Sequence, residues 1–169
     1  MNFLTADVYD AAPEQARVCT LDFRNYGGKS AFWGQCVTLR SNSHRPGVQM
    51  LATPGSSQVL IIDGGGTSSF ALLGATMAAN AVRNDWAGVI VCGAIRDTPE
   101  LCLLDLGIKA LGTSPALSTA FIDHTRDVPV TFGGVTFNPG DWVYADHDGV
   151  VVRSTPCVLG QGHPDQANY

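Results

Sequence analysis

The stretch VLIIDGGGTSSFALLGATMAANAVRNDWAGVIVCGAIRD, residues 59–97, decides the fold. Residues 59–63 and 89–92 are short, continuous apolar runs, which are typical of strands buried on both faces. Between them, residues 69–84 carry apolar side chains at a spacing of three to four, which predicts a helix. A third short strand is expected at residues 108–111. This order of elements predicts a parallel βαβαβ unit with right-handed connections.

Glycine residues are expected to end or interrupt strands, both in this unit and in the part of the chain before it. We expect Gly64–Gly66 and Gly93 to end the two buried strands. Residues 30–39 alternate loosely between apolar and polar side chains, which predicts a strand with a bulge at Gly34. A short helix is expected at residues 48–53.

The pattern changes towards the end of the chain. Short β-prone segments alternate there with turns that contain glycine and asparagine; they are residues 128–132, 135–137, 143–145 and 150–152. This spacing predicts a run of hairpins. Residues 1–153 are therefore expected to form one α/β domain with two kinds of sheet, and residues 154–169 a loose tail. At the other end, Thr5 or Asp7 is expected to cap a first helix.

The composition excludes several classes of protein. The 169 residues are 45% hydrophobic and 15% charged, which is too apolar for a disordered chain. The formal net charge is −5 and no basic run occurs, which argues against direct binding of nucleic acid through its phosphates. The low charge would fit a surface that is partly covered by neighbouring subunits.

The cysteines and the N-terminus bear on the cellular compartment. The five cysteines are irregularly spaced without a CxxC pair, which excludes a zinc ribbon and a thioredoxin-type motif. Most lie in apolar surroundings such as Leu101-Cys102-Leu103, so we expect buried, reduced thiols in a cytoplasmic protein. The N-terminal sequence MNFLTADVYD lacks a basic region, so no signal peptide is expected. No apolar run reaches the roughly 18 residues of a membrane span.

The glycine-rich segment GGGTSS, residues 64–69, follows a buried strand, as a nucleotide-binding loop would. Its spacing does not give GxGxxG, and no acidic residue closes the second buried strand. The segment therefore disfavours a dinucleotide or S-adenosylmethionine site. A tight strand-to-helix turn and a turn that shapes a substrate site both remain open.

Arg96, Asp97 and Glu100 form a candidate site after the second buried strand. Ligands of open α/β sheets bind at the carboxyl ends of parallel strands. Arginine can grip a carboxylate with two hydrogen bonds, and aspartate is a hard oxygen ligand suited to Mg²⁺ or Mn²⁺. Glu100 would face the same side one helical turn later. The alternative is an Arg–Asp pair that caps a helix over residues 96–104.

The histidines show no catalytic or metal-binding spacing. Neither HxH nor HExxH occurs, and all of them fall in predicted loops; they are His44, His124, His147 and His163. We expect them to be exposed rather than catalytic.

Several blocks of the sequence together resemble the RraA-like family. The blocks are LDFRNYGGKSAFWG (21–34), the stretch 59–97, LDLGIKALGTSP (104–115) and RDVPVTFGGVTFNPGDWVYADHDGVVV (126–152). Their order and spacing make the resemblance specific, and it covers roughly residues 5–153. The family includes the regulator of ribonuclease activity A and the class II 4-hydroxy-4-methyl-2-oxoglutarate aldolases.

The resemblance implies a fold, an assembly and a chemistry. The expected fold is a swivelling β/β/α three-layer sandwich, and the expected assembly is a ring-shaped homotrimer or a hexamer made of two trimers. The active site would lie between subunits. There a divalent cation, Mg²⁺ or Mn²⁺, would activate a pyruvyl substrate for aldol cleavage, and the same site would decarboxylate oxaloacetate.

The resemblance also implies roles for particular residues. Arg96 would hold the pyruvyl group and Asp97 would bind the metal directly. Glu100 would act through metal-bound water. Backbone N–H groups at a helix start would bind the substrate carboxylate; they belong to Gly74, Ala75, Thr76 and Met77.

Ala75 departs from the pattern that the aldolases of this family share. They usually carry an aspartate at this position, where it orients metal-bound water. One hypothesis is therefore a metal-dependent lyase in which Arg96 and Asp97 still stabilise an enolate. The other is a non-catalytic regulator that binds ribonuclease E or an RNA helicase, for which the negative net charge would suit a basic partner surface. A menaquinone methyltransferase, which follows an older label of the family, is disfavoured by the glycine spacing.

Overall fold

The computed structural model describes residues 4–157. Its elements in chain order are α1 (Thr5–Asp10), the 3₁₀ helix η1 (Pro13–Gln15), β1 (Arg17–Cys19), β2 (Arg24–Asn25), β3 (Phe32–Ser41), α2 (Arg45–Leu51), β4 (Val59–Ala71), α3 (Ala75–Arg83), β5 (Gly88–Ile95), α4 (Thr98–Leu101), β6 (Gly107–Thr113), β7 (His124–Arg126), β8 (Val130–Phe132), β9 (Val135–Phe137), β10 (Trp142–Ala145) and β11 (Val150–Arg153).

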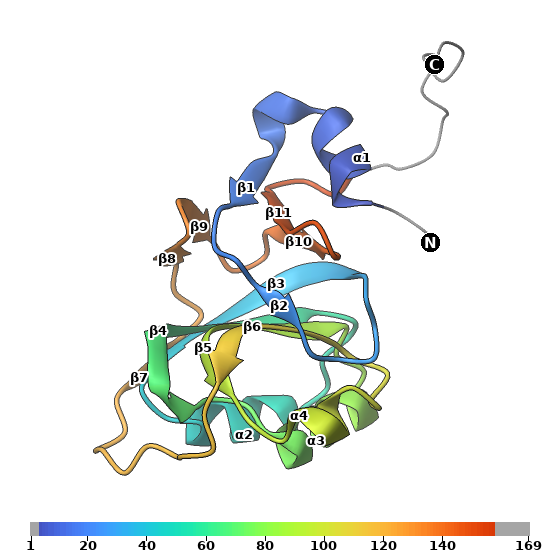
Figure 1. Cartoon of the computed structure of the whole chain (residues 1–169). Helices are drawn as coiled ribbons and strands as arrows, with labels where there is room; N and C mark the ends of the chain where they lie inside the picture. Colours follow the sequence, from blue (N-terminus) through green and yellow to red (C-terminus); the bar gives the residue numbers. More distant parts are fainter. Residues whose placement is uncertain (1–3, 158–169) are drawn as a thin grey trace.

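These elements form three layers (Figure 1). The central layer is the parallel run β3-β4-β5-β6, which confirms the predicted βαβαβ unit. Helices α2, α3 and α4 cover one face, and β1, β10, β11 and the hairpin β8–β9 lie on the other. Strand β3 belongs to two layers, because residues 32–35 pair antiparallel with β10 and residues 36–40 pair parallel with β4. The expected β/β/α sandwich is therefore observed.

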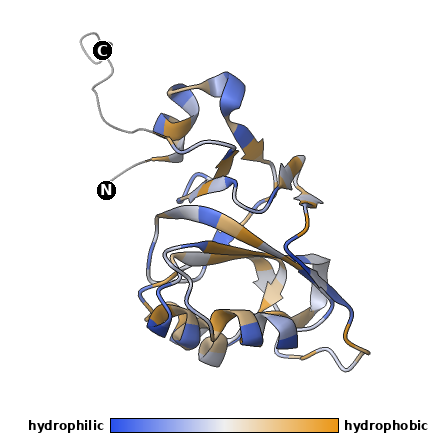
Figure 2. Cartoon of the chain, turned by 180° about the vertical axis from the view of Figure 1, so that it is seen from behind, coloured by the Kyte–Doolittle hydropathy of each residue, from blue (hydrophilic) through white to orange (hydrophobic). Residues whose placement is uncertain are grey.

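Two hydrophobic cores separate the layers. Alternate side chains of β4 and β5 enter different cores, as the two-residue period of a strand requires. Leu60, Ile62, Val89 and Val91 face the helices. Val59, Ile61, Ile90 and Cys92 face the second β layer. Figure 2 shows the hydrophobic colour along the central strands and polar stretches on the helices. The continuous apolar runs of the sequence thus correspond to strands covered on both faces.

Helix α1 is hydrogen-bonded to the turn between β10 and β11. It starts at the predicted place, but Leu4 rather than Thr5 or Asp7 is its N-cap residue. The backbone N–H and the hydroxyl of Thr5 donate to the two carboxylate oxygens of Asp146, at 2.6 and 2.7 Å. Asp146 is buried in the turn between β10 and β11. This carboxylate therefore fixes the N-terminal helix to the β10–β11 hairpin.

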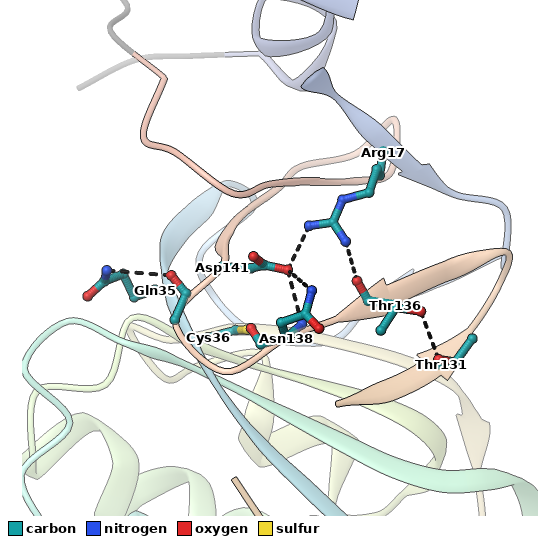
Figure 3. Close-up of polar contacts among 8 residues, drawn as sticks. Arg17, Gln35, Cys36, Thr131, Thr136, Asn138 and Asp141 are labelled. Atoms are coloured by element: carbon teal, nitrogen blue, oxygen red, sulfur yellow. Dashed lines mark hydrogen bonds and ion pairs between the residues drawn. The ribbon is translucent and has the colours of Figure 1, made fainter. Parts of the chain in front are cut away.

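A polar cluster around Asp141 holds the second β layer together (Figure 3). The Asp141 carboxylate lies 2.6 Å from Arg17 Nη2 and accepts hydrogen bonds from the backbone N–H and the side-chain amide of Asn138. Arg17 also donates to the carbonyl of Thr136. Burial, and then the Asp141 charge, raises the pKa of the adjacent Cys36 thiol to about 12. The cluster links β1 to the segment that joins β9 and β10.

The helix predicted over residues 69–84 begins later than expected. Helix α3 spans Ala75–Arg83, and the glycine-rich segment before it extends β4 instead of ending it. The pairing of β4 with β5 continues through Thr67 and Ala71, with register shifts on either side of Thr67. Gly65 and Gly66 take positive φ angles of 65° and 73° there, which glycine adopts readily. The segment is a distorted strand rather than a tight strand-to-helix turn.

Several other boundaries also differ from the predictions. Gly34 is no bulge, because its register with β10 is continuous; a side chain there would meet the Ser57 carbonyl oxygen at 2.3 Å. Strand β5 passes through Gly93 to Ile95. The helix expected over residues 48–53 is α2, three residues earlier at its start, and that expected over 96–104 is the single turn α4.

The C-terminal hairpins β8–β9 and β10–β11 are observed as predicted. The predicted tail begins within the described residues, but residues 158–169, and with them His163, lie outside them. All five cysteines are free thiols; Cys19, Cys36 and Cys92 are buried, but Cys102 is exposed, contrary to the prediction, because it follows the short α4 at the surface. None of the helices between residues 4 and 157 is long and apolar enough to cross a membrane.

Candidate active site

A cavity of approximately 210 Å³ lies at the carboxyl edge of the parallel strands. Each of the four strands contributes to it through the segment that follows: His44 after β3, Gly74 after β4, Arg96 after β5 and Leu117 after β6. This edge is where open α/β sheets bind their ligands. A wider hollow of approximately 540 Å³ includes Ser57 and precedes β4 and β5, at the opposite edge.

Arg96 and Asp97 are placed by the end of β5. The backbone N–H of Arg96 donates to the Leu73 carbonyl at 3.0 Å, and this hydrogen bond joins the end of β5 to the segment after β4. Asp97 has a left-handed backbone, with a φ angle of 63°. A non-glycine residue in this conformation is uncommon and frequently marks a functional segment. Here it directs the carboxylate away from α4, where Asp97 makes no side-chain cap, towards the start of α3.

The carboxylate of Asp97 contacts two partners through one oxygen. Its Oδ2 accepts the Ala75 N–H at 3.0 Å and lies 3.6 Å from Arg96 Nε. The Arg96 and Asp97 side chains are 38% and 36% exposed, so both keep surface for a ligand. The sequence alternative of an Arg–Asp pair that caps its own helix is wrong in one respect, because the capped N–H belongs to α3.

Gly74 has no side chain, and this leaves room for the Arg96 and Asp97 side chains beside the start of α3. Its φ of −145° is ordinary extended backbone, so glycine is not required for its conformation. A Cβ at this position would instead lie 2.7 Å from Asp97 Oδ2 and 3.4 Å from Arg96 Nε. A larger residue would therefore displace the carboxylate or the guanidinium.

The start of α3 supplies unpaired backbone donors. Ala78 donates to the Gly74 carbonyl, so the N–H groups of Ala75, Thr76 and Met77 precede the first intrahelical hydrogen bond. Asp97 takes the first of these. The N–H groups of Thr76 and Met77 and the positive end of the helix remain for an anion, beside the Arg96 guanidinium. The predicted carboxylate-binding residues are thus brought together, with Ala75 committed to Asp97.

The donor set at this edge fits a divalent cation that retains several waters. No group of three histidine, cysteine or acidic side chains with metal-binding geometry occurs within residues 4–157. Mg²⁺ is commonly held by one or two carboxylates together with water and substrate oxygens. Asp97 can supply one such carboxylate, because both of its contacts use Oδ2.

Glu100 lies apart from the other predicted site residues. It does not line the cavity with Arg96; it borders a neighbouring hollow with Ala75, Thr76 and Arg83. The first turn of α3 separates the two spaces, since Thr76 borders both. The role of Glu100 towards metal-bound water stays a prediction.

His44 and Asn80 are the polar residues of the cavity that the sequence interpretation missed. The Asn80 side chain accepts a hydrogen bond from Arg83 through its Oδ1. His44 is the one that the sequence interpretation expected to be exposed. It is partly buried, and burial together with the nearby positive charges of Arg45 and Arg96 lowers its pKa from the ordinary value. Asn42 and Ser43 separate it from the end of β3 at Ser41, whereas Arg96 follows the last residue of β5, Ile95. The sequence places His44 in the loop after the strand predicted over residues 30–39, but it does not show that this loop borders the same cavity as Arg96.

Comparison with known proteins assigns the chain to a family. The family model RraA-like, described as Aldolase/RraA, matches residues 5–152. The chain belongs to the RraA-like family. One curated relative, from Deinococcus radiodurans, is 50% identical to this chain; the match covers 88% of this chain and 92% of the relative. Another, from Laribacter hongkongensis, is 43% identical; that match covers 94% of this chain and all of the relative. Both carry the name "Putative 4-hydroxy-4-methyl-2-oxoglutarate aldolase".

Solved structures of RraA-like proteins share the fold closely. One, from Geobacillus kaustophilus, is described as an S-adenosylmethionine:2-dimethylmenaquinone methyltransferase and is 38% identical, with a TM-score of 0.89 over 95% of this chain and all of that one. Another, described as the RNA-processing inhibitor RraA from Thermus thermophilis, is 36% identical, with a TM-score of 0.89 over 96% of this chain and all of that one. The names within the family therefore span a lyase, a methyltransferase and an inhibitor.

Proposed function

We propose that this RraA-like protein is a divalent-metal-dependent lyase acting on pyruvyl substrates, of the 4-hydroxy-4-methyl-2-oxoglutarate aldolase and oxaloacetate decarboxylase type. One observation carries the proposal: the Asp97 carboxylate contacts both Arg96 and the first N–H of α3, in space that the missing side chain of Gly74 leaves open. This arrangement offers cationic and N–H donors for a carboxylate beside an oxygen ligand for a metal. The names of the curated relatives support the aldolase class.

The chain's own residues would bind and orient the substrate. The Arg96 guanidinium and the N–H groups of Thr76 and Met77 would hold the pyruvyl carboxylate. Asp97 would hold Mg²⁺ or Mn²⁺, which when bound supplies Lewis-acid polarisation of the neighbouring carbonyl. As the C3–C4 bond breaks, its electron pair moves towards that carbonyl, and Arg96 would stabilise the negative charge that develops there. C3 then takes a proton from solvent, which gives pyruvate.

Ala75 bears on which of the two reactions is faster. Aldol cleavage requires a base to remove the proton of the C4 hydroxyl as the bond breaks, whereas decarboxylation of oxaloacetate releases CO₂ without that step. Ala75 places no carboxylate at the start of α3. We therefore expect oxaloacetate decarboxylation to be the more active of the two reactions.

The test measures pyruvate release from oxaloacetate with Mg²⁺ or Mn²⁺, against a metal-only blank and against protein with chelator. We expect Asp97→Ala to lower the metal-dependent rate at least about 100-fold, as loss of a metal ligand or of a principal charge-stabilising group does. The matched control is Asp105→Ala, because the Asp105 side chain is 80% exposed in a surface ion pair with Lys29. Turnover equal to the blank, or unchanged in Asp97→Ala, would overturn the proposal.

A second candidate function is a regulator that binds a ribonuclease or RNA helicase. It is favoured by the close likeness to the structure described as an RNA-processing inhibitor and by Ala75 in place of an acid. The net charge of −5 would attract a basic partner surface, so such binding should weaken with salt. Salt-sensitive inhibition of purified ribonuclease E, together with turnover at the level of the blank, would favour this function over the lyase.

A further inference from the structure

The imidazole of His44 has one nitrogen enclosed and one that can face the cavity. His44 lines the cavity together with Gly74 and Arg96. Its Nδ1 is shielded from solvent and has no hydrogen-bond partner within residues 4–157. Nε2 is therefore the ring nitrogen that can meet a ligand.

The enclosed nitrogen decides where the proton of the ring resides. A hydrogen on Nδ1 would be a buried donor without an acceptor, which is unfavourable. We therefore assign the neutral tautomer with its hydrogen on Nε2. The doubly protonated ring would also place a hydrogen on Nδ1, and it would face the positive charges of Arg45 and Arg96. Asp97 also borders the cavity; its Oδ2 contacts Arg96 and Ala75, and in the proposed function its Oδ1 is taken by the metal.

The cavity consequently presents more donors than one carboxylate needs. The guanidinium of Arg96 and the N–H groups at the start of α3 suffice for a first carboxylate. The Nε2–H of His44 is a separate donor, placed by the loop between β3 and α2. Apolar walls from Val48 and Leu73 lie beside these groups and would exclude water from a bound chain of carbon atoms.

We propose that His44 is a specificity-determining residue, whose neutral Nε2–H binds the second carboxylate of a 2-oxo dicarboxylic acid. This inference rests on the proposed function, because the first carboxylate is assigned to Arg96. The site then selects dicarboxylates such as oxaloacetate over monocarboxylates such as pyruvate. A site that leaves a polar group unpaired with the wrong ligand discriminates strongly against that ligand.

Calorimetric titration with two unreactive acids tests the inference without any turnover. Pyruvate carries one carboxylate, and 2-oxoglutarate carries two; both are titrated into protein saturated with Mg²⁺. We expect the wild type to bind 2-oxoglutarate about tenfold more tightly than pyruvate, which is the effect of one hydrogen bond to a charged group. His44→Leu should abolish this preference and leave pyruvate affinity within about twofold, whereas His44→Gln, which keeps an N–H donor, should retain most of it.

Matched variants and pH separate the possible outcomes. His124→Leu, at an exposed residue of β7, should keep the full preference. A preference that is absent from the wild type, or that survives in His44→Leu, overturns the inference. A preference that grows as the pH falls from 8 to 6 would indicate a charged imidazolium and overturn the neutral donor. Pyruvate affinity unchanged in Arg96→Ala contradicts the proposed function instead, and failure to bind either acid overturns both.

Discussion

Two Arg–Asp pairs in this protein have the same chemistry and opposite surroundings. Arg17 Nη2 lies 2.6 Å from Asp141, whose side chain is 9% exposed. Arg96 Nε lies 3.6 Å from Asp97, and both side chains are more than a third exposed. Asn138 and Thr136 make the remaining hydrogen bonds of the first pair (Figure 3), whereas the second pair lines a cavity.

The difference separates a pair that holds the fold from a pair that can bind a ligand. Oδ2 of Asp141 contacts Arg17 and accepts both N–H groups of Asn138, so this carboxylate is satisfied within the protein. Breaking a buried pair leaves an uncompensated charge and is costly. Exposed pairs contribute little to stability, so Asp97 can exchange its contacts for a ligand at a small cost. The strained backbone of Asp97 agrees with selection for position rather than for stability.

The largest expected effect comes from removing the charge of each aspartate in turn. Asp141→Asn should lower the free energy of unfolding by about 2 kcal/mol, less than for a fully buried pair because the Arg17 side chain is 36% exposed. Asp97→Asn should change it by less than about 0.5 kcal/mol, as surface substitutions usually do. Urea unfolding at pH 7, followed by circular dichroism, measures both.

Activity provides the reverse comparison for the same two variants. Folded Asp141→Asn should keep wild-type turnover of oxaloacetate, since its carboxylate lies in the second β layer, away from the cavity. Asp97→Asn should lose the metal-dependent rate. Equal losses of stability in the two variants would show that the distinction drawn between the pairs is wrong.

A second, smaller effect concerns the space beside Asp97. Gly74→Ala places a methyl group where the distance to Asp97 Oδ2 would be 2.7 Å, so the carboxylate must move. We expect about tenfold weaker binding of Mn²⁺, comparable to the effect of displacing the support of a metal ligand. Mn²⁺ titration followed by electron paramagnetic resonance measures this directly.

Gly112→Ala is the matched control for that substitution. A Cβ at Gly112 in β6 meets no atom within 4 Å, so metal affinity should not change. Equal affinities of Gly74→Ala and the wild type would mean that Asp97 is not the metal ligand, or that its position is not constrained by Gly74.

The sequence predicts the central sheet because burial on both faces leaves a simple pattern. Residues 59–63 and 89–92 are apolar at every position except Asp63, and each becomes a central strand. The site is anticipated for a related reason. Arg96 and Asp97 stand directly after such a strand, so their position follows from topology without knowledge of any contact.

Other features depend on contacts that local sequence does not contain. The glycine-rich segment after Asp63 continues β4 because Thr67 and Ala71 find partners in β5, and a helical spacing of apolar residues cannot reveal those partners. The left-handed backbone of Asp97 turns its side chain to α3, which the pattern RDxxE does not encode. His44 escapes notice because its importance comes from three other strand ends that converge on the same cavity.

The smallest expected effect comes from a third aspartate, which is buried and held by neutral donors. Burial raises the pKa of Asp146, but hydrogen bonds from Thr5 and from the backbone of Asp148 and Gly149 outweigh it and hold the pKa below its ordinary value. A carboxyl group with a lowered folded-state pKa adds stability that is present above its unfolded-state pKa, about 4, and is lost as the pH falls through the folded value.

Wild type should therefore lose more stability between about pH 5 and pH 3 than Asp146→Asn, which has no carboxylate to protonate. Asp146→Asn should be the less stable protein at pH 7, because Asn offers Thr5 one acceptor oxygen in place of two, and the two urea midpoints should converge in acid. The exposed Asp105→Asn should retain the wild-type pH dependence. Parallel curves for wild type and Asp146→Asn would mean that neutral donors do not stabilise this carboxylate. The contrast between the Asp141 and Asp97 pairs would then rest on the closer approach of the arginine to Asp141, 2.6 Å against 3.6 Å, rather than on burial and hydrogen bonding.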